Sequence, residues 1–167
     1  MIGLKSYVKR YKNNLQNNLS QIFYMNILKS ISFFICLLLL SRLIPHPPNF
    51  TPIIAGIIFL PFMIGDKRMV LFIPILIMFI SDLIIGFHNH MIWTYTSFLL
   101  ISLGVVLYFK KTFKNIFFLS ILSPSLFFLL TNFGVWLTSS FYTKDFLGLM
   151  ECYFVALPFY ANNLTST

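Results

Sequence analysis

Three short polar segments interrupt a chain that is otherwise apolar, and each lies at the end of an apolar run. The first has the sequence RLIPHPPNFT at residues 42–51 and combines a cation, an imidazole, an amide and three prolines. The second covers residues 81–90 and the third residues 131–136. Cations, imidazoles and amides are groups with which proteins orient small polar ligands. The three segments would form one binding site if they lie on the same side of a membrane.

The composition indicates a membrane environment. Of the 167 residues, 58% are hydrophobic and 10% are charged, and the mean hydropathy is +0.85. A soluble domain carries about 25% charged residues. The net charge is +8, but the cations are concentrated in a few segments between apolar runs. That pattern favours attachment to an anionic leaflet over binding of nucleic acid, which needs a continuous basic face. No nucleic-acid partner is therefore expected.

Six apolar runs approach or reach the length of about 20 residues that a membrane-spanning helix needs. We predict an all-α membrane protein, a bundle of about six transmembrane helices. A basic N-terminal segment occupies residues 1–24 and a transmembrane domain residues 25–167. The predicted spans are residues 25–43, 51–64, 69–87, 91–109, 116–137 and 146–160. The second is short, and Pro124 is expected to kink the fifth. The last is either a span, which we favour, or an interfacial segment.

The orientation follows from lysine and arginine, which are enriched in short cytoplasmic loops. The N-terminal segment has four such residues, residues 67–68 have two and residues 110–114 have three, whereas the alternate loops have few. The N-terminus is therefore predicted to be cytoplasmic, in a multi-pass protein of the inner (plasma) membrane. All three histidines then fall on the outer side, together with Asn49, Asp82 and Asn132.

The ionisable groups allow alternative interpretations. Asp82 lies inside the third predicted span, where an ionisable side chain marks a polar pathway or an ion pair. It is expected either to pair with Arg42, which would connect the first and third spans, or to contact a ligand directly. His46 stands between two prolines in a stiff loop. Its imidazole is either hydrogen-bonded at the interface or in contact with a ligand or metal.

Two further groups are less specific. His88 and His90 are two residues apart, and with His46 and Asp82 they would offer nitrogen and oxygen ligands to a metal. The His-Asn-His pattern alone is a weak signal, and no metal site is predicted. Asn132 is an amide within an apolar run, and it either bonds a neighbouring helix or faces a cavity.

No motif indicates catalysis. The chain has no phosphate-binding loop, dinucleotide-binding turn or nucleophile elbow, and Glu151 is its only glutamate. Cys36 and Cys152 are interpreted as small buried hydrophobes. Trp136 and Tyr95 are either interfacial residues or cavity walls. Neither an enzyme nor a cofactor is predicted.

Four motifs carry a family resemblance: RLIPHPPNFTP at 42–52, SDLIIGFH at 81–88, TNFGVWL at 131–137, and CY at 152–153 before LPF. They resemble an uncharacterised family of small bacterial integral membrane proteins that is similar to the substrate-binding (S) components of energy-coupling-factor (ECF) transporters. The resemblance implies six helices, both ends cytoplasmic, and a vitamin pocket near the outer face capped by the outer loops. It also implies a coupling membrane subunit and ATPases as partners. The sequence departs from the family pattern in two respects. S components carry small residues spaced by four on the first helix, whereas residues 30–40 here are mostly bulky, and family members continue for one more apolar helix after the Pro-Phe segment.

The function predicted from these observations is capture of a vitamin- or cofactor-like small molecule from the outer face, by a subunit without catalysis. The polar contacts would come from Arg42, His46, Asn49, Asp82, His88 and Asn132, and the apolar walls from Phe50, Tyr95 and Trp136. A structural or assembly subunit of a membrane complex is the alternative. A metal-dependent membrane enzyme that uses the histidines is a third, weaker hypothesis.

Overall fold

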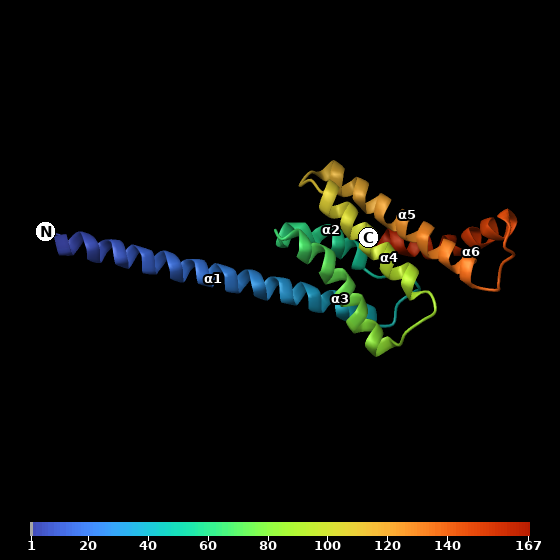
Figure 1. Cartoon of the computed structure of the whole chain (residues 1–167), viewed down its shortest axis with the longest axis horizontal. Coiled ribbons are helices and arrows are strands. Elements are labelled where there is room, and N and C mark those ends of the chain that lie inside the picture. The colour runs from blue at the N-terminus through green and yellow to red at the C-terminus, as the bar shows by residue number, and fades with distance from the viewer. Residues whose placement is uncertain (1) are drawn as a thin grey trace. The chain divides into compact units, whose positions relative to one another are not determined.

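The computed structural model describes the backbone of residues 2–167 and the side chains of residues 16–22 and 24–167. Over this range the regular structure is entirely helical, and Figure 1 labels the six helices in chain order. Their bounds are Ile2–Leu43 (α1), Ile53–Met63 (α2), Lys67–Ile85 (α3), Met91–Tyr108 (α4), Phe113–Thr138 (α5) and Phe146–Ser166 (α6). The predicted all-α class and the six helical segments are confirmed.

The chain divides after Cys36 into two compact units. The first contains most of α1, a helix of 42 residues, so the predicted boundary at residue 24 lies inside a continuous helix. Described apolar side chains of this unit, such as those of Ile22 and Leu28, are exposed. Cys36 is also exposed, which corrects its interpretation as a buried hydrophobe.

Four helical stretches among the described residues are long and apolar enough to cross a membrane: Gln16–Leu43 of α1, and α3, α4 and α5. Helix α2 is apolar but has only 11 residues. Helix α6 has 21 residues and continues past the predicted end at residue 160, but it falls outside this group. The polar side chains of Glu151, Asn162 and Asn163 lower its apolar character. Its crossing of a membrane stays a prediction.

Helix α2 forms the centre of the second unit. The side chains of Ile53, Ile54, Ile57 and Leu60 are at most 2% exposed, and the helix contacts α3, α4 and α5. At 1.5 Å per residue, α2 is about 16 Å long and α3 about 28 Å long. Because the two helices are joined by a short loop, α2 reaches only part of the way along α3. The irregular segment 44–52 precedes α2, and its residues 44–50 are exposed.

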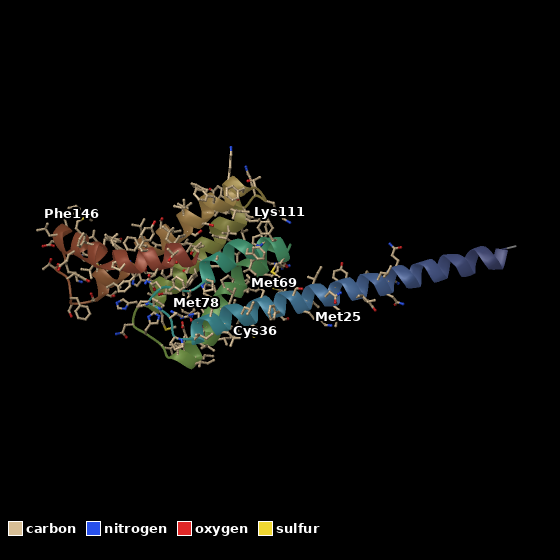
Figure 2. The ribbon with its side chains drawn as sticks, turned by 180° about the vertical axis from the view of Figure 1, so that it is seen from behind. Met25, Cys36, Met69, Met78, Lys111 and Phe146 are labelled. Carbon is tan, nitrogen blue, oxygen red and sulfur yellow. The ribbon has the colours of Figure 1, made fainter. Side chains whose placement is uncertain are left out.

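The two basic loops of the second unit lie at the same end. The Lys111 ammonium is 5.6 Å from the ring centroid of Phe62 near the end of α2, and the rings of Phe62 and Phe109 meet edge to face at 4.9 Å. The α2–α3 loop is therefore adjacent to the α4–α5 loop. In Figure 2, Met69 and Lys111 lie toward this end of the unit and Phe146 lies toward the other.

Helices α4 and α5 pack closely through aromatic rings. The Phe98 and Phe127 rings are 5.1 Å apart, and those of Trp93 and Phe133 are 5.7 Å apart. Gly134 makes the approach of Trp93 possible, because a Cβ atom at that position would overlap the indole ring. Helix α5 continues through buried Pro124 without a break, so this proline does not divide the helix.

Helix α6 packs antiparallel to the second half of α5. The Tyr153 hydroxyl donates to the Leu129 carbonyl at 2.8 Å. At its end, α6 contacts the α1–α2 segment, where the Asn162 amide donates to the Pro48 carbonyl and the Ser166 hydroxyl to the Thr51 carbonyl, both at 3.1 Å. Helix α6 therefore holds this irregular segment against the bundle.

Gly134→Ala is expected to destabilise the protein, because the added methyl group must displace Trp93. Overpacking of this kind costs about 1–3 kcal/mol. Gly104→Ala is the matched control, because an added Cβ there has no atom within 4 Å. Thermal unfolding in detergent should show a melting temperature several degrees lower for the first variant only. Equal melting temperatures would contradict this packing.

Asp145→Ala is expected to remove the N-cap of α6. The Asp145 carboxylate accepts from the Gly148 amide and from the Thr143 hydroxyl, both at 2.8 Å. These bonds, the Gly148 amide first, lower the pKa of Asp145 below its usual value. A lowered folded-state pKa means that the cap contributes stability above about pH 4 and loses it as the pH falls through that pKa.

The melting temperatures of wild type and Asp145→Ala should therefore differ at pH 7 and converge toward pH 3. Glu151→Gln, which changes an exposed carboxylate on the same helix, is the control and should follow wild type at pH 7. A difference between wild type and Asp145→Ala that is the same at both pH values would refute the capping role.

Candidate functional site

A buried ion pair connects the last turn of α1 to α3. Nη2 of Arg42 lies 2.9 Å from Oδ1 of Asp82, and the two side chains are 15% and 1% exposed. Arg42 lies at the C-terminal end of α1, where the helix dipole favours a cation. Of the two interpretations of Asp82, the structure contains the ion pair rather than a carboxylate open to a ligand.

Both carboxylate oxygens of Asp82 are occupied. The Tyr95 hydroxyl of α4 donates to Oδ2 of Asp82 at 2.9 Å. Nη1 of Arg42 donates to the Ser81 hydroxyl at 2.6 Å, and it also lies near the sulfur and the carbonyl of Met78, at 2.9 and 3.3 Å. Figure 2 labels Met78 on α3. The network joins three helices, so Asp82 and Tyr95 position the Arg42 side chain.

Arg42 retains hydrogen-bonding capacity. A guanidinium has five N–H donors, and its contacts with Asp82, Ser81 and Met78 all involve Nη1 and Nη2. Among the residues that the structure describes, none accepts a hydrogen bond from Nε of Arg42.

Arg42 lines a cavity of about 320 Å³, here called the first cavity. Polar side chains from the α1–α2 segment, the α3–α4 loop and α4 share it with an apolar floor. Its lining residues are Arg42, His46, Asn49, Thr51, Met78, Ile85, His88, Thr94, Phe98 and Phe127. Met78, Phe98 and Phe127 lie near the middle of their helices, so the cavity extends to about half the depth of the bundle.

A second cavity of about 330 Å³ lies between α4, α5 and α6. Its lining residues are Pro48, Asn49, His90, Thr94, Phe127, Thr131, Asn132, Val135, Tyr142, Cys152, Val155, Ala156 and Phe159. Asn49, Thr94 and Phe127 line both cavities, so the two adjoin. Burial raises the pKa of Tyr142, and nearby Cys152 and Glu151 add to this, so its hydroxyl stays protonated.

The turn before α2 brings the backbone to the cavities. The Phe50 amide donates to the Pro47 carbonyl at 3.0 Å, and Asn49 has φ of 61°, a conformation that asparagine adopts more readily than most residues. No side chain caps the N-terminus of α2. Thr51, two residues before this helix, lines the first cavity, so the positive end of the helix dipole borders it.

Four of the predicted site residues therefore line the first cavity: Arg42, His46, Asn49 and His88. Asn132 lines only the second. Its Nδ2 donates to the Phe128 carbonyl of its own helix at 2.8 Å, so it does not bond a neighbouring helix through that atom.

Three predicted residues have other surroundings. Tyr95 lines neither cavity, and its hydroxyl donates a hydrogen bond to the Asp82 carboxylate. Phe50 and Trp136 line neither cavity: Phe50 is 43% exposed, and Nε1 of Trp136 donates to the Thr143 carbonyl at 2.8 Å. The Lys144 ammonium also lies over the Trp136 ring, 5.8 Å from its centroid.

The three histidines do not form a metal-binding group with Asp82. Within residues 16–22 and 24–167, no group of three or more His, Cys, Asp or Glu side chains is arranged to hold a metal ion. His46 lies in the first cavity, where its Nδ1 is 2.9 Å from the Pro47 carbonyl, whereas His90 lines the second.

The sequence did not identify two residues that line both cavities, Thr94 and Phe127, or most of the residues that line only the second cavity. Thr94, Phe127 and Tyr142 were not among the candidates. Thr94 and Phe127 lie inside predicted spans and Tyr142 lies in a loop between two of them, and no motif at these positions indicates a binding site. Thr131 directly precedes Asn132 and Thr94 directly precedes Tyr95, and this adjacency to a candidate residue was the available signal.

Arg42→Gln is expected to destabilise the protein strongly, because it leaves the Asp82 carboxylate buried without its cation. Removing one partner of a buried pair costs about 3–5 kcal/mol. Arg68→Gln is the matched control: Arg68 pairs with Asp66 at 3.4 Å, but it is 83% exposed, and such pairs contribute little. Melting temperatures in detergent should fall markedly for Arg42→Gln alone. Equal decreases in melting temperature for the two variants would mean that the buried pair contributes no more stability than the exposed one.

Comparison with known proteins identifies the family but not the activity. No curated protein and no solved structure matches the chain. One family model matches residues 17–167, which is most of the sequence. The chain therefore belongs to DUF6580, a family of unknown function.

Proposed function

We propose that this protein is a membrane-embedded, non-catalytic subunit that captures a small molecule from the outer face of the inner (plasma) membrane for uptake. The observation that carries the proposal is the Arg42 side chain. A buried carboxylate fixes it, and it lines a cavity of about 320 Å³ that adjoins a second cavity. A fixed donor beside a cavity of this size is typical of ligand sites.

The charge distribution supports an outward-facing site. The cavities lie among the α1–α2 segment, the α3–α4 loop and the α5–α6 region, whereas the basic α2–α3 and α4–α5 loops lie together at the other end. Basic short loops stay in the cytoplasm. The N-terminus is then cytoplasmic, the chain is multi-pass, and the cavities open to the outside.

The short helix α2 supports binding within the bundle. Irregular backbone is tolerated at membrane depth where it lines a cavity, and half-length helices often flank transporter binding sites. The segment 44–52 is irregular and lines both cavities. A substrate-binding subunit needs a coupling membrane subunit and ATPases for transport, as the resemblance to ECF S components implies, and a vitamin- or cofactor-like ligand fits the cavity volumes.

A second candidate is a structural or assembly subunit of a membrane complex. The specific observation in its favour is that Asp82 has both oxygens satisfied within the protein, by Arg42 and Tyr95. A network of this kind also locks helices together without any ligand.

The two candidates differ in what the purified protein retains. Wild type purified in mild detergent should release a defined small molecule, detected by mass spectrometry after extraction. His46→Ala should lose it at an unchanged melting temperature, because the His46 ring is exposed and its one described hydrogen bond is to the Pro47 carbonyl. Arg68→Gln, remote from the cavities, should retain it.

A structural subunit would give the opposite result. Wild type would then hold no small molecule above the level of a detergent blank, or His46→Ala would hold as much as wild type. Either finding would contradict capture.

A further inference from the structure

The two adjoining cavities differ in charge. The first contains the Arg42 guanidinium and two imidazoles, those of His46 and His88. The second is lined by hydroxyl, amide, thiol and apolar side chains, and His90 is the one residue of its lining that can carry a positive charge. A ligand that occupies both cavities would place its charged part in the first cavity and its uncharged part in the second.

We propose that the ligand is a small molecule with one anionic group and an uncharged, partly apolar body. The anionic oxygens bind Arg42 in the first cavity, and the body lies in the second cavity beside α5 and α6. This inference rests on the proposed function and specifies the ligand class of the same site.

The anionic group follows from the free donor of Arg42. Nη1 and Nη2 contact Ser81, Met78 and Asp82, while Nε has no acceptor among the described residues. Guanidinium N–H groups bind carboxylate and phosphate oxygens through charge-assisted hydrogen bonds, which are about twice as strong as neutral ones. Because Asp82 and Tyr95 hold the side chain, little rotamer freedom is lost on binding.

The charge of the ligand is limited to one. Asp82, buried at 1% exposure, already compensates the charge of Arg42. A second negative charge on the ligand would lie close to that carboxylate in a poorly screened environment, where like charges repel strongly. A monoanion such as a carboxylate adds one negative charge to the compensated pair and a dianion adds two, so the monoanion is favoured.

The body of the ligand follows from the second cavity. Its apolar walls include Phe127, Val155 and Phe159. Nδ2 of Asn132 bonds the Phe128 carbonyl, which leaves Oδ1 without a partner among the described residues and free to accept a hydrogen bond. The body is therefore apolar over most of its surface and carries an N–H or O–H donor.

Two threonines give matched positions for a test that does not require the ligand. Thr51 lines only the first cavity and Thr131 only the second. Thr51→Cys and Thr131→Cys are made in the full chain with Cys36 and Cys152 replaced by serine. Each thiol is reacted with an anionic reagent, sulfonatoethyl methanethiosulfonate, and a cationic one, trimethylammonioethyl methanethiosulfonate. Each rate is divided by the rate with free cysteine.

The expected result is a preference for the anionic reagent of roughly tenfold at Thr51→Cys, because the guanidinium borders this cavity whereas Asp82 does not, and the nearer charge raises the local concentration of anions. Thr131→Cys should show little preference. In the Thr51→Cys background, the paired change Arg42→Gln with Asp82→Asn removes both buried charges and should abolish the preference. The comparison of the two threonine positions decides the question even if this last variant does not fold.

The contradicting results separate the two proposals. Equal rates at Thr51→Cys, or a preference for the cationic reagent there, would overturn the anionic ligand class while leaving an open cavity. If neither position reacts in the folded protein, although both thiols react after denaturation, the cavities are closed to solutes. That result would overturn the proposed function as well.

Discussion

The buried pair of Arg42 and Asp82 is the interaction on which the second unit depends. It joins the end of α1 to α3 at 2.9 Å, and Tyr95 extends it to α4. Desolvation of two charges is costly, so a buried pair adds little net stability over an apolar contact. Its more important effect here is geometric. Asp82 fixes the guanidinium in one orientation, with Nη1 and Nη2 toward α3 and Nε free.

The short helix α2 creates the space that this arginine lines. With about 16 Å of length, α2 fills one half of the bundle centre, and its isoleucines pack against α3, α4 and α5. The irregular segment 44–52 precedes α2 and is held by α6 through the Pro48 and Thr51 carbonyls. Both cavities border this segment.

The sequence predicted the helices better than the site. Apolar runs placed six segments, because a helix satisfies the backbone hydrogen bonds of an apolar run within the run itself. The sequence also predicted that the second segment, residues 51–64, is short. The pairing of Arg42 with Asp82 was one of the two alternatives predicted for the Asp82 carboxylate. The continuation of α1 through residues 2–24 was not predicted, since a polar, basic composition does not distinguish a helix from a solvated segment. Thr94 and Phe127 could not be predicted as site residues, because only tertiary packing brings the middle of α4 and α5 to the α1–α2 segment.

The measurement that tests the central claim most directly is ligand retention and melting temperature of Arg42→Lys. Lysine keeps the positive charge beside Asp82, but it lacks Nε–H and the planar fork of the guanidinium. If Arg42 both locks the helices and binds a ligand, this variant should melt within a few degrees of wild type and lose the small molecule that copurifies with it. A variant that retains both its stability and the small molecule would contradict the account, because the free face of the arginine would then have no role.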